Sequence, residues 1–66
     1  MNPSQKKASR LLDIEMLLLS HPEGLTQAEI ARRLGVNRST VHRYLPELPK
    51  HVYIDDLDGE KLKIDR

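Results

Sequence analysis

The sequence predicts a mainly α-helical domain that ends in a small β-hairpin. Apolar residues recur at helical spacing in three segments up to Leu45, and each segment is bounded by residues that start or stop helices. After His51 the pattern changes to an alternation of apolar and polar residues on both sides of Asp58-Gly59, a hairpin signal. Because 66 residues suffice for one core only, we expect a single domain over residues 9–66.

The composition excludes several classes of protein. The absence of cysteine excludes disulfides and thiolate metal sites and predicts an intracellular, cytoplasmic protein. The apolar run 16–19 is far too short to span a membrane. The three histidines lack the spacing of a zinc site, and there is no phosphate-binding glycine loop. We therefore expect no metal, no cofactor and no enzymatic activity.

The formal net charge of +1 conceals an uneven distribution of charge. Residues 1–12 carry three basic side chains and no acid, and residues 26–43 carry four arginines against one glutamate. Residues 44–60 reverse this balance, with five acidic side chains against one lysine. A basic front with an acidic flank suits a protein that binds a polyanion in one orientation, although ordinary solvated charge would look the same.

Residues 1–8 are polar and predict a flexible basic N-terminal arm. In this arm Lys6 and Lys7 either contact DNA phosphates or only keep the chain soluble. The helix expected over residues 9–20 has two apolar strips, of which the second consists of Leu12, Met16 and Leu19. The domain either wraps this helix deeply or leaves the second strip to dock on a second copy or another domain, and we favour docking.

The next helix is expected over residues 26–34. Thr26 and Glu29 have the spacing of a capping box, in which each side chain accepts a hydrogen bond from the backbone amide of the other residue. Gly35 is suited to end the helix in a left-handed conformation. Asn37 is a good N-cap for a third helix, and so short a connection predicts a helix-turn-helix.

The third helix is expected over residues 38–45, with Val41 and Leu45 facing the core. Pro46 disfavours its continuation except as a distorted turn. Its opposite face carries the candidate DNA contacts Arg38, Ser39, Thr40, His42 and Arg43. An arginine there either pairs with guanine O6 and N7 in the major groove or binds phosphate.

The smaller polar residues on this face have their own alternatives. Ser39 and Thr40 are short donors that suit phosphate, or they are present because such residues favour helix starts. His42 either contacts DNA or is solvated. Of Arg32 and Arg33 in the preceding helix, one is a surface charge and the other a phosphate contact, and Arg32 is the candidate.

The alternating segments predict antiparallel strands at about residues 51–55 and 61–65. A two-stranded hairpin is marginally stable alone, so its apolar face, with Val52 and Ile54, must lie against the helices.

These elements, with the pattern L-T-x-x-E-I-A-x-x-L-G-V-x-x-S-T-V-x-R-x-L over residues 25–45, resemble a bacterial three-helix winged helix-turn-helix. Within that class the chain is similar to the N-terminal DNA-binding domains of DeoR-type repressors and of regulators with a WYL domain. The resemblance implies sequence-specific binding of double-stranded DNA by a nucleoid-associated transcription regulator. It also implies a homodimer, assembled either by this domain or through a further domain that is absent from this chain.

The resemblance assigns roles to individual positions. Ser39, Thr40, His42 and Arg43 match recognition-helix positions that touch bases and phosphates. Arg38 stands at the start of that helix, and Gln27 matches a position that contacts the DNA backbone.

Two features depart from the resemblance. Pro46 falls where relatives continue the helix. The hairpin tip over residues 56–60 is acidic, whereas a wing that enters the minor groove is expected to be basic, so only Lys61 and Lys63 remain to reach the backbone. The acidic wing and the first helix also support an alternative, in which the domain is a protein-interaction module.

Overall fold

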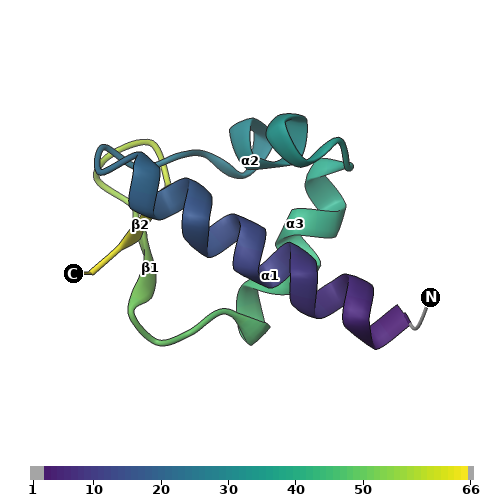
Figure 1. Ribbon diagram of the computed structural model, residues 1–66. Coiled ribbons are helices and arrows are strands. Elements are labelled where there is room, and N and C mark those ends of the chain that lie inside the picture. The colour runs from purple at the N-terminus through teal and green to yellow at the C-terminus, as the bar shows by residue number, and fades with distance from the viewer. Residues whose placement is uncertain (1–2, 66) are drawn as a thin grey trace.

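The computed structural model consists of three helices followed by a two-stranded hairpin (Figure 1). It describes residues 3–65, and the side chains from Ala8 onward. The elements are α1 (Pro3–Ser20), α2 (Gln27–Leu34), α3 (Arg38–Tyr44), the 3-10 turn η1 (Leu45–Glu47), β1 (Val52–Asp55) and β2 (Lys61–Ile64). This order confirms the predicted fold class, a winged helix-turn-helix.

Helix α1 begins earlier than the sequence pattern predicts. It starts at Pro3 rather than near Ser9, so residues 3–8 are helical where a flexible arm is expected. Proline suits the first helical position because its fixed φ matches the helix and its missing amide hydrogen has no partner there. The residues that follow are mostly good helix formers. Residues 1–2 lie outside the described part of the chain.

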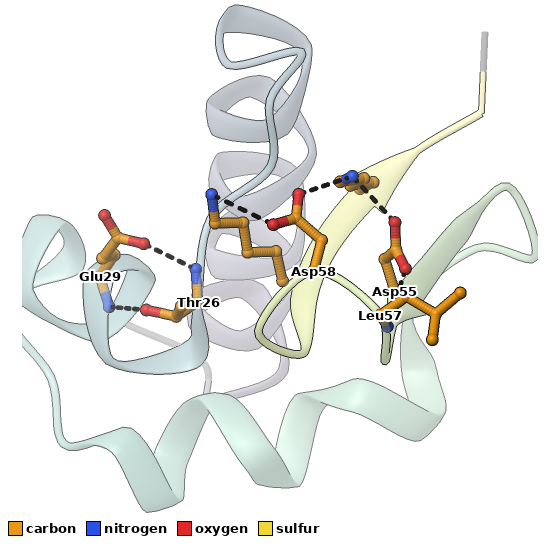
Figure 2. Close-up of polar contacts among 7 residues, drawn as sticks. Thr26, Glu29, Asp55, Leu57 and Asp58 are labelled. Atoms are coloured by element: carbon orange, nitrogen blue, oxygen red, sulfur yellow. Dashed lines mark hydrogen bonds and ion pairs between the residues drawn. The ribbon is translucent and has the colours of Figure 1, made fainter.

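Helix α2 begins and ends as predicted. The Thr26 hydroxyl accepts a hydrogen bond from the Glu29 amide at 3.2 Å, and the Glu29 carboxylate accepts one from the Thr26 amide at 2.9 Å (Figure 2). These two bonds satisfy amides that the first turn of a helix leaves without partners. Gly35 ends the helix with φ 71°, in the left-handed region.

Helix α3 ends at Tyr44 and continues as the 3-10 turn η1 around Pro46. This confirms that proline allows only a distorted continuation beyond Leu45. Asn37 is the N-cap residue as expected, but its side chain makes no capping hydrogen bond.

The core draws side chains from all three helices, from the loop before α2 and from the wing. Its buried members are Ile14, Leu18, Leu25, Ile30, Ala31, Val41 and Leu62. Helix α1 runs across the molecule in Figure 1 and contacts both α2 and β2. The wing therefore covers part of the same core as the helices, which is how the short hairpin gains its stability.

The hairpin pairs in the register Val52↔Ile64 and Ile54↔Leu62. Leu62 is fully buried, and Val52 and Ile64 pack against the core, as the alternation predicts. Ile54 departs from the prediction because 42% of it is exposed. It belongs to the strand farther from α1, so the helices do not cover it completely.

A third segment pairs with the hairpin, and the sequence pattern does not show it. Leu25 forms an antiparallel bridge with Leu62, in which the Leu25 amide donates to the Leu62 carbonyl at 3.0 Å and the Leu62 amide donates back at 2.7 Å. The bridge ties the connection between α1 and α2 to the wing. It thereby fixes the position of the wing beside the start of α2.

Gly24 makes this close approach possible. Its φ is 88°, and a Cβ built at this position would lie 2.7 Å from Lys63 Cγ and 2.9 Å from the Leu62 carbonyl oxygen. Both the left-handed backbone and the lack of space therefore require glycine.

The tip of the wing is a tight turn over residues 58–61. The Lys61 amide donates to the Asp58 carbonyl at 3.2 Å, and Gly59 and Glu60 both have positive φ, at 64° and 57°. Two consecutive positive φ values are typical of a type I′ hairpin turn. The turn lies where Asp58-Gly59 predicts it, but its central residues are Gly59 and Glu60.

Candidate nucleic-acid interface

Helix α3 presents its polar face to solvent. Val41 is fully buried and anchors the helix on the core. The other residues predicted to contact DNA are accessible: Arg38, Ser39, His42 and Arg43 are exposed, and Thr40 is half-buried. Of these, Arg38, Ser39 and His42 line one hollow.

The start of α2 adds Gln27 to this surface. Its half-buried side chain lines a hollow of about 400 Å³ together with Arg38, Ser39 and His42. The fold thus brings Gln27, a candidate from the resemblance, close to three of the candidates on α3. Arg32 is exposed in the last turn of α2, at the other end of that helix, and does not line the hollow.

Lys6 and Lys7 belong to α1, but their side chains lie outside the described part of the structure.

The two arginines of α3, Arg38 and Arg43, are exposed and take part in none of the ion pairs of the described chain. An arginine with no internal partner keeps all five of its N–H donors for an external anion. This surface is therefore suited to recognise phosphate or the guanine edge.

The lysines of the wing are engaged by acids of the same hairpin. Lys63 Nζ lies 2.9 Å from Asp55 Oδ2 and 3.0 Å from Asp58 Oδ2, and Lys61 Nζ lies 3.8 Å from Asp58 Oδ1 (Figure 2). Hydrogen bonds to Asp55 and Asp58 raise the pKa of Lys63 well above its usual range. The bond from Lys63, with one from the Leu57 amide, lowers the pKa of Asp55.

Lys61 and Lys63 are the residues through which the wing is expected to reach the DNA backbone. These ion pairs neutralise their positive charge. A sequence signal for these ion pairs exists: Asp55 stands opposite Lys61 in the register, which makes Lys63 its diagonal neighbour on the ladder. The register must be known before that signal can be used.

The wing tip lies beside the start of both helices of the helix-turn-helix. A second hollow of about 330 Å³ is lined by residues of α2, α3 and the wing tip, namely Thr26, Gln27, Ala28, Arg38, Gly59 and Glu60. This juxtaposition has no signal in the local sequence, because it follows from the bridge between Leu25 and Leu62.

The second apolar strip of α1 is on the surface, as predicted. The exposed fractions are 59% for Leu12, 65% for Met16 and 48% for Leu19. Beside it, Met16 and Leu17 line a hollow of about 360 Å³ that extends to Arg33 and Leu34 of α2.

The fold and the basic face of α3 define a DNA-binding domain of the winged helix-turn-helix class. Residues 7–55 match the family of the IclR helix-turn-helix domain, and the chain belongs to this family. It is similar to the HTH-type transcriptional regulator Rv1719 of Mycobacterium tuberculosis, with 48% identity over 40 residues. That match covers 61% of this chain and only 15% of the relative. No solved structure matches the chain.

These findings confirm the class predicted from the sequence, a helix-turn-helix domain of a transcription regulator, which is a DNA-binding and not a catalytic module. They do not support the narrower resemblance to DeoR-type or WYL-domain regulators, because the matching family is IclR. They also give no support to the alternative of a protein-interaction module. None of the helices in the described residues is long and apolar enough to cross a membrane.

Proposed function

We propose that this domain binds double-stranded DNA sequence-specifically, with α3 in the major groove. The observation that carries the proposal is the exposed pair Arg38 and Arg43 on α3, neither of which has an acidic partner in the described chain, while the buried Val41 anchors the helix on the core. In a helix-turn-helix the second helix lies in the groove with its first residues on base edges. The place of action of such a regulator is the bacterial cytoplasm, on the chromosome.

Each candidate residue has a role in this proposal. Arg43 pairs with a guanine edge or with phosphate, Arg38 contacts the duplex at the start of α3, and His42 contacts a base. The remaining candidates bind the phosphate backbone: Ser39 and Thr40 from α3, Gln27 and Arg32 from α2, and Lys6 and Lys7 from the start of the chain.

The test is a titration of a fluorescent random-sequence duplex at low and moderate salt. We expect affinity to fall steeply with salt, because phosphate binding releases counterions. Arg38→Ala and Arg43→Ala should each weaken binding about 5- to 100-fold, the range for the loss of one charged contact. Arg33→Ala is the matched control, since Arg33 belongs to α2 and lines the hollow beside Met16 and Leu17, away from α3.

Repeating the titration with duplexes of several defined sequences distinguishes base contacts from phosphate contacts. Loss of a phosphate contact should reduce the salt slope by about one, whereas loss of a base contact should relax sequence preference without that change. Absence of binding at low salt and high protein concentration would contradict the proposal.

We further propose that the strip of Leu12, Met16 and Leu19 packs against a second copy, so that two domains bind a two-fold operator. Three apolar side chains exposed along one side of a helix support this, since contiguous apolar surface marks an association site. Half-sites would then lie about 34 Å apart, one helical turn, or a multiple of it. Sedimentation should show a concentration-dependent dimer that Met16→Lys abolishes, and a strictly monomeric domain would contradict the proposal.

A further inference from the structure

We propose that Glu60 is a negative determinant of DNA affinity, whose carboxylate limits how closely a phosphate approaches the Gln27–Arg38 end of the interface. This inference rests on the DNA-binding function proposed above.

The first observation is the location of Glu60. It lines the hollow between the wing tip and the helices together with Gln27 and Arg38. The same two residues line the neighbouring hollow with Ser39 and His42, which are on the candidate DNA face. Glu60 therefore stands at the edge of that face, next to an arginine that is expected to attract phosphate.

The second observation is that the turn holds Glu60 in this place. Its φ of 57° is rare for a residue with a side chain, and the hydrogen bond from the Lys61 amide to the Asp58 carbonyl closes the turn around it. The Asp58 carboxylate is bound to Lys63, and β2 is bound to Leu25 through Leu62. The backbone at Glu60 is thus connected to the start of α2 through two sets of contacts.

The third observation is that its charge is not compensated. Asp55 and Asp58 have lysine partners, whereas exposed Glu60 forms no ion pair with any described residue. Charges on a protein surface act over about 8–10 Å at moderate salt, so this carboxylate repels phosphates that come near Arg38. The affinity of this end of the interface for phosphate is therefore lower than Arg38 alone would give.

The experiment measures binding of the 66-residue chain to a random-sequence duplex at several salt concentrations. Glu60→Gln keeps the size of the side chain and removes its charge, and should bind about two- to fourfold more tightly at low salt, with the gain disappearing as salt rises. Glu60→Lys should bind more tightly still and steepen the salt slope by about one, because it adds a phosphate contact.

Asp56→Asn is the matched control, since Asp56 belongs to the same loop but does not line the hollow. It should change affinity clearly less than Glu60→Gln. In addition, the gain from Glu60→Gln should shrink when Arg38 is alanine, because the phosphate that Glu60 repels is the one that Arg38 attracts.

The outcomes separate the two proposals. If the wild-type chain binds and Arg38→Ala weakens it, but Glu60→Gln binds like wild type or Asp56→Asn gives an equal gain, the inference about Glu60 is wrong and the proposed function stands. If neither the wild-type chain nor Glu60→Gln binds the duplex, both are wrong.

Discussion

Helix α3 and the wing both carry basic side chains, but only α3 leaves them without ion-pair partners among the described residues. Arg38 and Arg43 have no acidic partner among the described residues, whereas Lys63 is held between Asp55 and Asp58. A lysine already engaged in two ion pairs must lose them before it binds a phosphate. The number of basic residues in each region therefore says less about DNA binding than the location of their acidic neighbours.

The contrast also concerns how each region is built. The polar face of α3 follows from helical periodicity around Val41, which is a local property. The charge pattern of the wing depends on strand register, on the turn over residues 58–61 and on the bridge between Leu25 and Leu62. Perturbing the joint between the two regions should therefore have the largest effect.

Gly24→Ala is expected to produce that effect. Alanine at this position would have to adopt the left-handed backbone conformation, and its Cβ would collide with Lys63 and the Leu62 carbonyl. We expect a loss of about 2–4 kcal/mol in the free energy of unfolding, from backbone strain and overpacking together. Chemical denaturation measures this loss.

Gly35→Ala is the control, because Gly35 also has positive φ but has no atom within 4 Å of the added Cβ. It should lose only about 1–2 kcal/mol, the cost of the left-handed backbone conformation alone. Equal losses at the two positions would show that the contact between Gly24 and the wing does not matter.

The second prediction compares a lysine of the wing with an arginine of α3. Lys63→Met keeps the aliphatic stem that lies against Gly24 and removes the charge, and should change duplex affinity by no more than about threefold. Arg38→Ala should weaken it by about 5-fold or more. Fluorescence anisotropy at low salt measures both, and a loss for Lys63→Met as large as that for Arg38→Ala would remove the distinction between helix and wing.

The same comparison shows what the sequence predicts and what it does not. The three helices, the hairpin, the capping box at Thr26 and the exposed face of α3 are set by neighbours within a few residues, and all are found from spacing. The early start of α1 at Pro3 is missed because a polar segment gives no apolar periodicity.

Long-range features of the site escape sequence analysis for a different reason. The ion pairs of Lys63 and the hollow between Glu60 and Arg38 join residues that only the fold brings together. The capping hydrogen bond expected at Asn37 does not form, since residue preference specifies the cap position but not the rotamer.

The third prediction uses the two helix caps, one on each helix of the motif. Thr26→Ala removes a hydroxyl that accepts from the Glu29 amide, and should lower the free energy of unfolding by about 1 kcal/mol. Asn37→Ala should cost less, because the Asn37 side chain makes no capping bond. Thermal unfolding of both variants tests this order, and the reverse order would mean that Asn37 caps α3 in solution.

The smallest expected effect is the dependence of wing stability on pH. Asp55 has a pKa below its ordinary value, chiefly because it accepts a hydrogen bond from Lys63. A carboxyl whose pKa is lower in the folded state stabilises the fold above its ordinary pKa of about 4, and this contribution is lost as the pH falls through the folded value. Glu29 acts in the same direction, since its bonds with Thr26 lower its pKa.

The stability contributed by Asp55 should therefore be complete at neutral pH and decline below about pH 4. Asp55→Asn should melt at a lower temperature than wild type at pH 7, and the two melting temperatures should approach each other at pH 3. Asp56 does not contact Lys63, so the melting temperature of Asp56→Asn should change between the two pH values by as much as that of wild type. A difference in melting temperature between Asp55→Asn and wild type that stays constant from pH 7 to pH 3 would mean that the charge of Asp55 does not contribute to stability. In that case the lysines of the wing would not be neutralised by ion pairs, and the electrostatic difference between the wing and α3 would have to be sought elsewhere.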